Sequence, residues 1–186
     1  ASDVAGKSAL IMGFGRIGQR VGALCRALGL RVAAFDPYME RSPVEWVEMV
    51  KDFRAILPET DFLCLHLPST PETRDLIGAG ELALLKRGAF VLNCARGGIV
   101  DEDVLCDALE SGHLGGAGLD VFAKEPPDTA HRLFRQEKVL LSPHNAALTE
   151  ECAIRMATQA VQNVLDCLDG KLQPRVVMNR REIGMA

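Results

Sequence analysis

The chain has 186 residues, of which 48% are hydrophobic and 25% charged, a composition typical of a globular protein and not of a disordered chain. Its formal net charge is -4 and it has no cluster of Lys and Arg, so we expect neither nucleic acid nor an anionic membrane as a partner. No apolar run approaches the roughly 18 residues that span a bilayer, and no basic-then-apolar secretory pattern opens the chain, so we expect a cytoplasmic protein.

Short apolar runs alternate with segments of helical periodicity along the chain. The first run, Ser8 to Met12, leads through a glycine-rich turn into a helix that Gly29 ends. We expect further strands at residues 31–35, 62–67, 89–93, 116–121 and 138–141. We expect further helices at residues 80–86, at 101–112 with Asp101 as the N-cap, and at 149–170 with Thr149 as the N-cap. This alternation predicts an α/β fold with a doubly wound parallel sheet, as in Rossmann domains.

Neither the cysteines nor the histidines form a pattern that binds metal. The six cysteines contain no Cys-x-x-Cys pair and lie mostly in apolar segments, where a thiol behaves as a small hydrophobic group. The four histidines lack the i,i+4 spacing of a helical zinc site. We therefore expect reduced cysteines and no metal.

The glycine turn predicts a dinucleotide site. Gly13 closes the first strand, Gly15 lets the backbone approach a pyrophosphate, and Gly18 lets the new helix approach the sheet. The helix N-terminus then faces the phosphates. Asp36, eighteen residues after Gly18, ends the second strand, where a carboxylate accepts hydrogen bonds from the adenosine ribose. Because that carboxylate repels a 2'-phosphate, we expect NAD as the cofactor, although nearby Arg41 weakens the preference.

Three ionisable residues follow later strands, at the sheet edge where ligands bind in this fold. His144 can act as a general base because imidazole titrates near neutral pH. The guanidinium of Arg96 can bind a carboxylate through two parallel hydrogen bonds. The carboxylate of Glu125 can stabilise a protonated histidine. Each residue also has a purely structural interpretation. Arg96 can be a surface cation, Glu125 a loop charge and His144 a turn residue. Their placement at successive strand ends favours a shared site.

These residues lie in motifs that resemble the D-isomer-specific 2-hydroxyacid dehydrogenases over nearly the whole chain. The motifs are Gly6-Lys7, Gly13-Phe-Gly-Arg-Ile-Gly18, His66-Leu-Pro68 with Thr70-Pro-Glu-Thr73, Asn93-Cys-Ala-Arg-Gly-Gly-Ile-Val-Asp-Glu102, Gly118-Leu-Asp-Val-Phe122, Glu125-Pro126 and Ser142-Pro-His144. The resemblance implies that Arg96 binds the carboxylate and carbonyl of a small 2-hydroxy or 2-keto acid, and that His144 is the acid/base paired with Glu125.

The resemblance also implies a set of cofactor contacts in addition to the glycines. These are Arg16, Ile17, Asp36, Pro68, Thr73, Cys94, Ala95, Arg96, Asp120 and His144. A structural alternative for Asp120 is that it caps the loop after its strand. The motif gives Cys94 no role as a nucleophile.

In this family a substrate domain precedes the cofactor domain. Because the glycine turn begins at residue 13, we expect residues 1–170 to be the NAD-binding domain, including the last long helix, with the substrate domain absent. Residues 171–186 resemble the tail that returns to that domain. We therefore expect NAD binding with little turnover. The apolar stripe of the last helix, which includes Ile154, Val161 and Leu168, favours a homodimer.

Two other interpretations remain open. The C-terminal-binding corepressors resemble the same family and keep a similar Arg, Glu and His set, and a peptide-binding cleft in the N-terminal domain would distinguish them. Formate dehydrogenases share the scaffold, but their relatives carry Gln beside the histidine, so Glu125 argues against them. Among hydroxyacid dehydrogenases, the motif at Asn93 is similar to phosphoglycerate dehydrogenases, with glyoxylate or hydroxypyruvate reductases as close alternatives.

Overall fold

The structure is a computed structural model that describes residues 3–180 and 182–184. The chain divides into two compact units, Ala1–His144 and Asn145–Ala186. The first unit contains the whole sheet and the second contains the last long helix.

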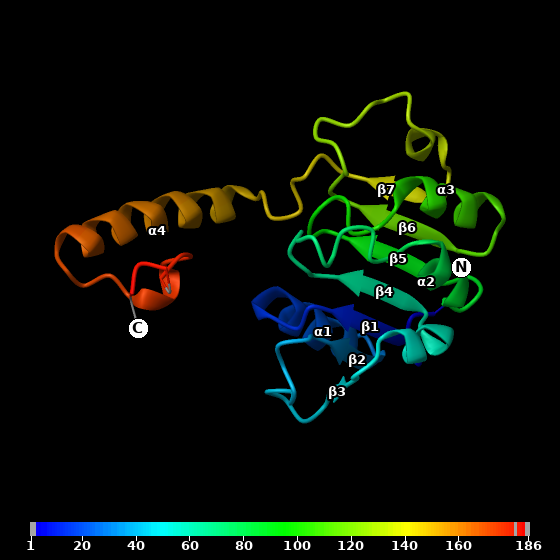
Figure 1. Cartoon of the computed structure of the whole chain (residues 1–186), viewed down its shortest axis with the longest axis horizontal. Coiled ribbons are helices and arrows are strands. Elements are labelled where there is room, and N and C mark those ends of the chain that lie inside the picture. The colour runs from blue at the N-terminus through cyan, green and yellow to red at the C-terminus, as the bar shows by residue number, and fades with distance from the viewer. Residues whose placement is uncertain (1–2, 181, 185–186) are drawn as a thin grey trace. The chain divides into compact units, whose positions relative to one another are not determined.

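The described residues of the first unit form one sheet of seven parallel strands, in the order β3-β2-β1-β4-β5-β6-β7 (Figure 1). The strands are β1 (Ser8–Met12), β2 (Arg31–Phe35), β3 (Glu48–Met49), β4 (Phe62–Leu65), β5 (Phe90–Asn93), β6 (Gly116–Leu119) and β7 (Val139–Leu141). The order reverses between β1 and β4, which is the switch point where ligands bind in doubly wound sheets. The predicted fold class is confirmed.

The strand register places the chemistry at one edge of the sheet. Neighbouring strands are paired so that the last residue of each lies opposite the last residue of the next, in the row Phe35, Met12, Leu65, Asn93, Leu119 and Leu141. The residues that follow them, Asp36, Gly13, His66, Cys94, Asp120 and Ser142, therefore begin loops at the same edge. Residues far apart in the sequence are brought together in this way.

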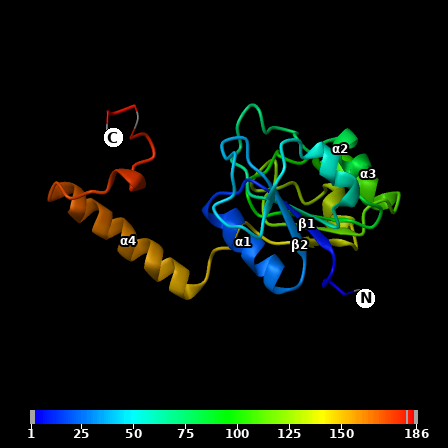
Figure 2. The same ribbon diagram turned by 90° about the horizontal axis from the view of Figure 1, so that it is seen from below.

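The helices of the first unit cover the two faces of the sheet. Alternate side chains of a strand point to opposite faces, so Ile11 packs with α1 (Arg16–Ala27), whereas Leu10 and Met12 pack with the other helices. These are α2 (Ala79–Leu84) and α3 (Glu102–Glu110). Figure 2 shows α1 on one side of the sheet and α2 and α3 on the other. The unit therefore has three layers, with the sheet between two layers of helices and one apolar cluster on each face of the sheet.

Several predicted boundaries differ from the structure. The strands expected to reach Leu67 and Val121 end two residues earlier, at Leu65 and Leu119, because the chain there leaves the sheet into the loops that begin at His66 and Asp120. Strand β3 and the 3-10 helices η1 (Arg54–Glu59) and η2 (Arg132–Arg135) were not predicted. They are too short to produce a periodic apolar pattern.

The second unit contains α4 (Glu150–Leu168) and the 3-10 turn η3 (Pro174–Val176). The Thr149 hydroxyl accepts a hydrogen bond from the Cys152 amide at 3.1 Å, which confirms the predicted N-cap. Apolar side chains along α4 are exposed, with Leu168 at 80%. The prediction that residues 1–170 form one domain stays a prediction, and the expected tail, 171–186, includes residues 181, 185 and 186, which lie outside the described residues.

Candidate active site at the carboxyl edge of the sheet

The glycine turn connects β1 to α1 by close backbone contacts. Gly13 has a φ of +87°, and a Cβ there would lie 2.5 Å from the carbonyl oxygen of His66. A Cβ on Gly18 would lie 2.0 Å from the carbonyl oxygen of Gly13. Gly15 differs, because no described atom lies within 4 Å of the place its Cβ would occupy. The fold therefore requires Gly13 and Gly18, whereas Gly15 leaves open space.

Asp36 connects the glycine turn to the end of β2. Its Oδ2 accepts a hydrogen bond from the Phe14 amide at 2.9 Å, and its Oδ1 accepts one from the Tyr38 amide at 3.0 Å. The carboxylate therefore fixes the turn at the end of β2. It also lines a cavity of about 530 Å³ with Met39, Arg41 and other residues that follow β2.

The residues of this edge fit a dinucleotide. No described side chain caps the N-terminus of α1, so its amide groups are free to bind a phosphate above the open space at Gly15. Beyond β4, the Thr73 hydroxyl donates to the Pro68 carbonyl at 2.7 Å and accepts from the Thr70 amide at 2.8 Å, which closes that loop beside the turn.

The loop after β5 is fixed by a buried asparagine. The side chain of Asn93, which is 3% exposed, donates from Nδ2 to the Arg96 carbonyl at 2.9 Å. It also accepts from the Ala95 amide at 3.1 Å. These bonds hold Cys94, Ala95 and Arg96 in a tight turn, with Nη1 of Arg96 donating to the Ala95 carbonyl at 2.6 Å. Burial, together with the charge of Asp120, raises the pKa of the Cys94 thiol, so it is protonated at neutral pH.

Asp120 begins the loop after β6 and is 3% exposed. It accepts a hydrogen bond from the Ser142 hydroxyl at 2.5 Å, which connects the ends of β6 and β7. This bond is a structural contact of Asp120 at the sheet edge.

Glu125 and His144 form a hydrogen-bonded pair across the loops after β6 and β7. Oε2 of Glu125 lies 2.8 Å from Nδ1 of His144, and its Oε1 accepts from the Phe122 amide at 3.1 Å. The hydrogen bond from His144, followed by that from Phe122, lowers the pKa of the Glu125 carboxyl. His144 has a φ of +53°, and its side chain is 48% exposed. The pair is preorganised and accessible.

The structure adds groups that the sequence interpretation did not single out. Asn93 and Ser142 hold two of the predicted residues, and each could have been noticed as a polar residue at the end of an apolar strand. His66 has a buried Nε2 with no hydrogen-bond partner among the described residues, and burial lowers its pKa. Within the same residues, no group of three His, Cys, Asp or Glu side chains is placed to hold a metal ion.

The sequence matches one family over most of its length. The model of the family described as D-isomer specific 2-hydroxyacid dehydrogenase, NAD binding domain, matches residues 1–146. The D-3-phosphoglycerate dehydrogenase of Mycobacterium leprae is 42% identical over 178 residues, which cover 95% of this chain and 33% of that protein. The glyoxylate reductase of Aeropyrum pernix is 40% identical over 180 residues, covering 94% of this chain and 52% of that protein.

Solved structures agree with these relatives. The NAD-complexed D-isomer specific 2-hydroxyacid dehydrogenase of Lactobacillus delbrueckii ssp. bulgaricus is 30% identical with a TM-score of 0.86, covering 96% of this chain and 58% of that one. The NAD-dependent formate dehydrogenase of Staphylococcus aureus is 27% identical with a TM-score of 0.83, covering 93% and 52%. The chain thus spans between a third and about three fifths of the length of these four proteins.

The matched residues include the glycine turn and the Glu125–His144 pair, whose geometry is described above. The chain therefore belongs to the D-isomer-specific 2-hydroxyacid dehydrogenase family, in the part that binds NAD.

Proposed function

We propose that this chain is the NAD-binding part of an enzyme that interconverts a D-2-hydroxy acid and its 2-keto acid. The observation that carries the proposal is the 2.8 Å contact between Oε2 of Glu125 and Nδ1 of His144 at the carboxyl edge of the sheet. Proton transfer to or from a substrate oxygen needs a group that both accepts and donates near neutral pH, which imidazole does.

His144 is the proposed acid/base. With Nδ1 engaged by Glu125, Nε2 is the ring nitrogen left to take the hydroxyl proton during oxidation and to return it during reduction. Because its pKa is lowered, Glu125 stays ionised and stabilises the protonated ring. NAD, when bound, supplies the hydride acceptor.

Arg96 is the proposed substrate anchor. It follows β5, at the same edge as the pair, and a planar guanidinium binds a carboxylate with two parallel hydrogen bonds. In the same proposal, Gly13, Gly15, Gly18 and the first residues of α1, Arg16 and Ile17, bind the pyrophosphate, and Asp36 binds the adenosine ribose. The proposed contacts along the remaining loops are Pro68, Thr73, Cys94, Ala95 and Asp120.

The test is a panel of 2-keto acids reduced with NADH by the enzyme at full length, including glyoxylate, hydroxypyruvate and the keto acid of phosphoglycerate. We expect turnover with at least one of them and a fall of about a hundredfold or more in His144→Ala, since acid–base catalysis contributes on that order. Retained turnover in His144→Ala would overturn the role of the histidine. Glu125→Gln should lower turnover less, because the ring remains in place.

We expect the 186-residue chain alone to bind NAD with little turnover. The side chains of His144 and Glu125 are 48% and 38% exposed, whereas hydride transfer benefits from a site that excludes water. A robust steady-state rate with this chain and any 2-keto acid would contradict this expectation.

We further propose a homodimer in the cytoplasm. Apolar side chains along α4, such as Ile154, Val161 and Leu168, are exposed, and an apolar patch of this kind favours self-association. All six cysteines are free thiols, which suits a reducing compartment. Light scattering at high protein concentration should give the mass of two chains, and a strictly monomeric profile would count against the dimer.

A further inference from the structure

We infer that Glu102, the first residue of α3, is a positioning residue that sets the geometry between Arg96 and the Glu125–His144 pair by holding the Phe122–Ala123 peptide. Its Oε1 accepts a hydrogen bond from the Ala123 amide at 2.6 Å, across 21 residues of sequence. The inference rests on the proposed function for the roles of the residues it positions.

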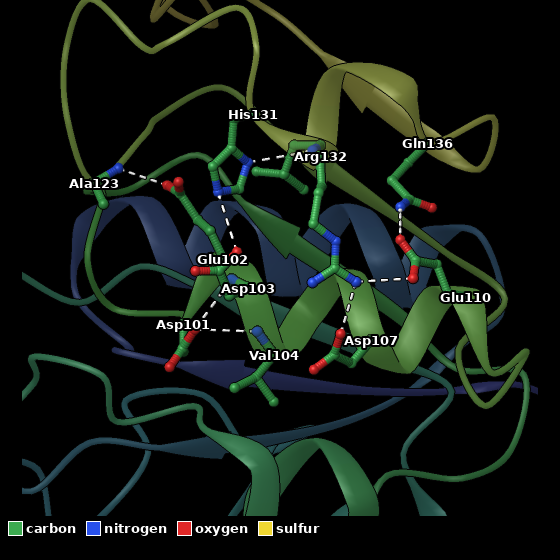
Figure 3. Close-up of polar contacts among 11 residues, drawn as sticks. Asp101, Glu102, Asp103, Val104, Asp107, Glu110, Ala123, His131, Arg132 and Gln136 are labelled. Carbon is green, nitrogen blue, oxygen red and sulfur yellow. Dashed lines mark hydrogen bonds and ion pairs between the residues drawn. The ribbon is translucent and has the colours of Figure 1, made fainter.

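The start of α3 fixes where the Glu102 carboxylate lies. Asp101 caps the helix by accepting from the amides of Asp103 and Val104, both at 3.1 Å. Glu102 therefore stands on a fixed first turn, and its side chain reaches out to the loop after β6 (Figure 3). A charged acceptor makes a stronger hydrogen bond than a neutral one, which suits an anchor for a loop.

The Phe122–Ala123 peptide connects the proposed catalytic groups. On one side, the N–H of Phe122, which belongs to the adjoining Val121–Phe122 peptide, donates to Oε1 of Glu125 at 3.1 Å, and Oε2 of the same carboxylate bonds His144. On the other side, a Cβ on Gly97 would lie 1.8 Å from the Phe122 carbonyl oxygen, so the loop that carries Arg96 lies directly against this peptide. A shift of the peptide therefore moves the acid–base pair relative to Arg96.

The rest of the loop is attached to α3 at other points, further from Glu125. Arg132 forms ion pairs with Asp107 at 2.7 Å and Glu110 at 2.8 Å, and Nε2 of Gln136 donates to Glu110 at 2.7 Å (Figure 3). These contacts hold η2. Of the α3 contacts drawn in Figure 3, the one at Ala123 is nearest in sequence to Glu125, so it is the one expected to govern the catalytic carboxylate.

The test compares Glu102→Ala with Glu102→Gln, in which the amide oxygen can still accept. The control is Asp103→Ala, which also removes an acidic residue from the first turn of α3 and a loop contact, His131 at 3.5 Å, without touching Ala123. Two readouts on the 186-residue chain need no turnover: hydrogen exchange of the Ala123 amide, and the pKa of the Glu125 carboxyl by carbon NMR.

In Glu102→Ala we expect the Ala123 amide to exchange at least about tenfold faster, since it loses a charge-assisted hydrogen bond. We also expect the pKa of Glu125 to rise toward its ordinary value. Asp103→Ala should stay close to wild type in both, whereas Glu102→Gln should fall between wild type and Glu102→Ala, because a neutral oxygen accepts a weaker hydrogen bond than a carboxylate. If Glu102→Ala leaves the Glu125 pKa unchanged, whether or not Ala123 exchanges faster, the inference is overturned. Failure of the proposed function would appear separately, as undiminished turnover in His144→Ala.

Discussion

The glycines at the site differ in whether a side chain would fit at their positions. Gly18 and Gly97 stand where a Cβ would lie 2.0 Å and 1.8 Å from backbone oxygens, whereas Gly15 faces open space. The first two are required by the fold and the third by the ligand that we propose for that space. Stability and binding measurements can therefore separate the two kinds of position.

Gly18→Ala should destabilise the first unit by about 3 kcal/mol, because backbone oxygens cannot move away from the added methyl as a flexible side chain could. Gly80→Ala is the matched control: Gly80 lies in α2, its Cβ would meet nothing within 4 Å, and it should gain about 0.5–1 kcal/mol from the better helix propensity of Ala. Urea unfolding followed by Trp46 fluorescence measures both. Equal free energies of unfolding for Gly18→Ala and Gly80→Ala would contradict the close backbone contact at Gly18.

The Glu125–His144 pair should respond to acid in a defined direction. Because the folded-state pKa of Glu125 is lowered from 4.5, the pair's contribution is fully present above pH 4.5 and is lost as pH falls through the lowered value. In His144→Ala the Glu125 pKa should rise toward 4.5, since the largest cause of its shift is gone. The pKa of Glu110, lowered by Arg132, should not change. A Glu125 titration unchanged by this substitution would show that the pair does not form.

At the site, the sequence could indicate residues near the ends of strands, because Asp36 directly follows an apolar run and Arg96 and His144 each lie three residues beyond one. It could not show that the Asp36 carboxylate also holds the Phe14 amide. That contact depends on the tertiary arrangement of two loops. For the same reason, the contact between Glu102 and Ala123 leaves no pattern in the sequence.

At the scale of elements, the N-cap of α3 should be worth about 1 kcal/mol. Asp101→Ala removes the acceptor for the amides of Asp103 and Val104, so the free energy of unfolding should fall by that amount. Asp101→Asn keeps a side-chain oxygen and should restore most of it. Urea denaturation of wild type and the two variants measures these free energies of unfolding. If Asp101→Asn is as unstable as Asp101→Ala, the side chain of Asp101 does not cap the helix.

Long elements were predicted well because their physical signals are local. Helix α3 begins after the predicted cap Asp101, and the six strands from β1 to β7 other than β3 were all expected. Strand β3 was missed because Glu48–Met49 forms only through pairing with β2, and η1 includes Pro58 in a segment without helical periodicity. Short elements that depend on a neighbour have no signature of their own.

At the scale of the whole molecule, the register of the sheet decides where chemistry can occur. Aligned strand ends place the glycine turn and Asp36 on one side of the switch point, and the loops of Arg96 and His144 on the other. A dinucleotide lying across that edge would have its adenosine at Asp36 and its nicotinamide near the acid–base pair. We therefore propose that this edge binds NAD in a fixed direction.

A calorimetric titration of the 186-residue chain with NADH and with NADPH tests that claim most directly. We predict that NADH binds at least about tenfold more tightly, because the Asp36 carboxylate repels a 2'-phosphate, and that Gly15→Val abolishes NADH binding while the chain stays folded. Absence of NADH binding to the unchanged chain, or NADPH bound as tightly as NADH, would contradict the account.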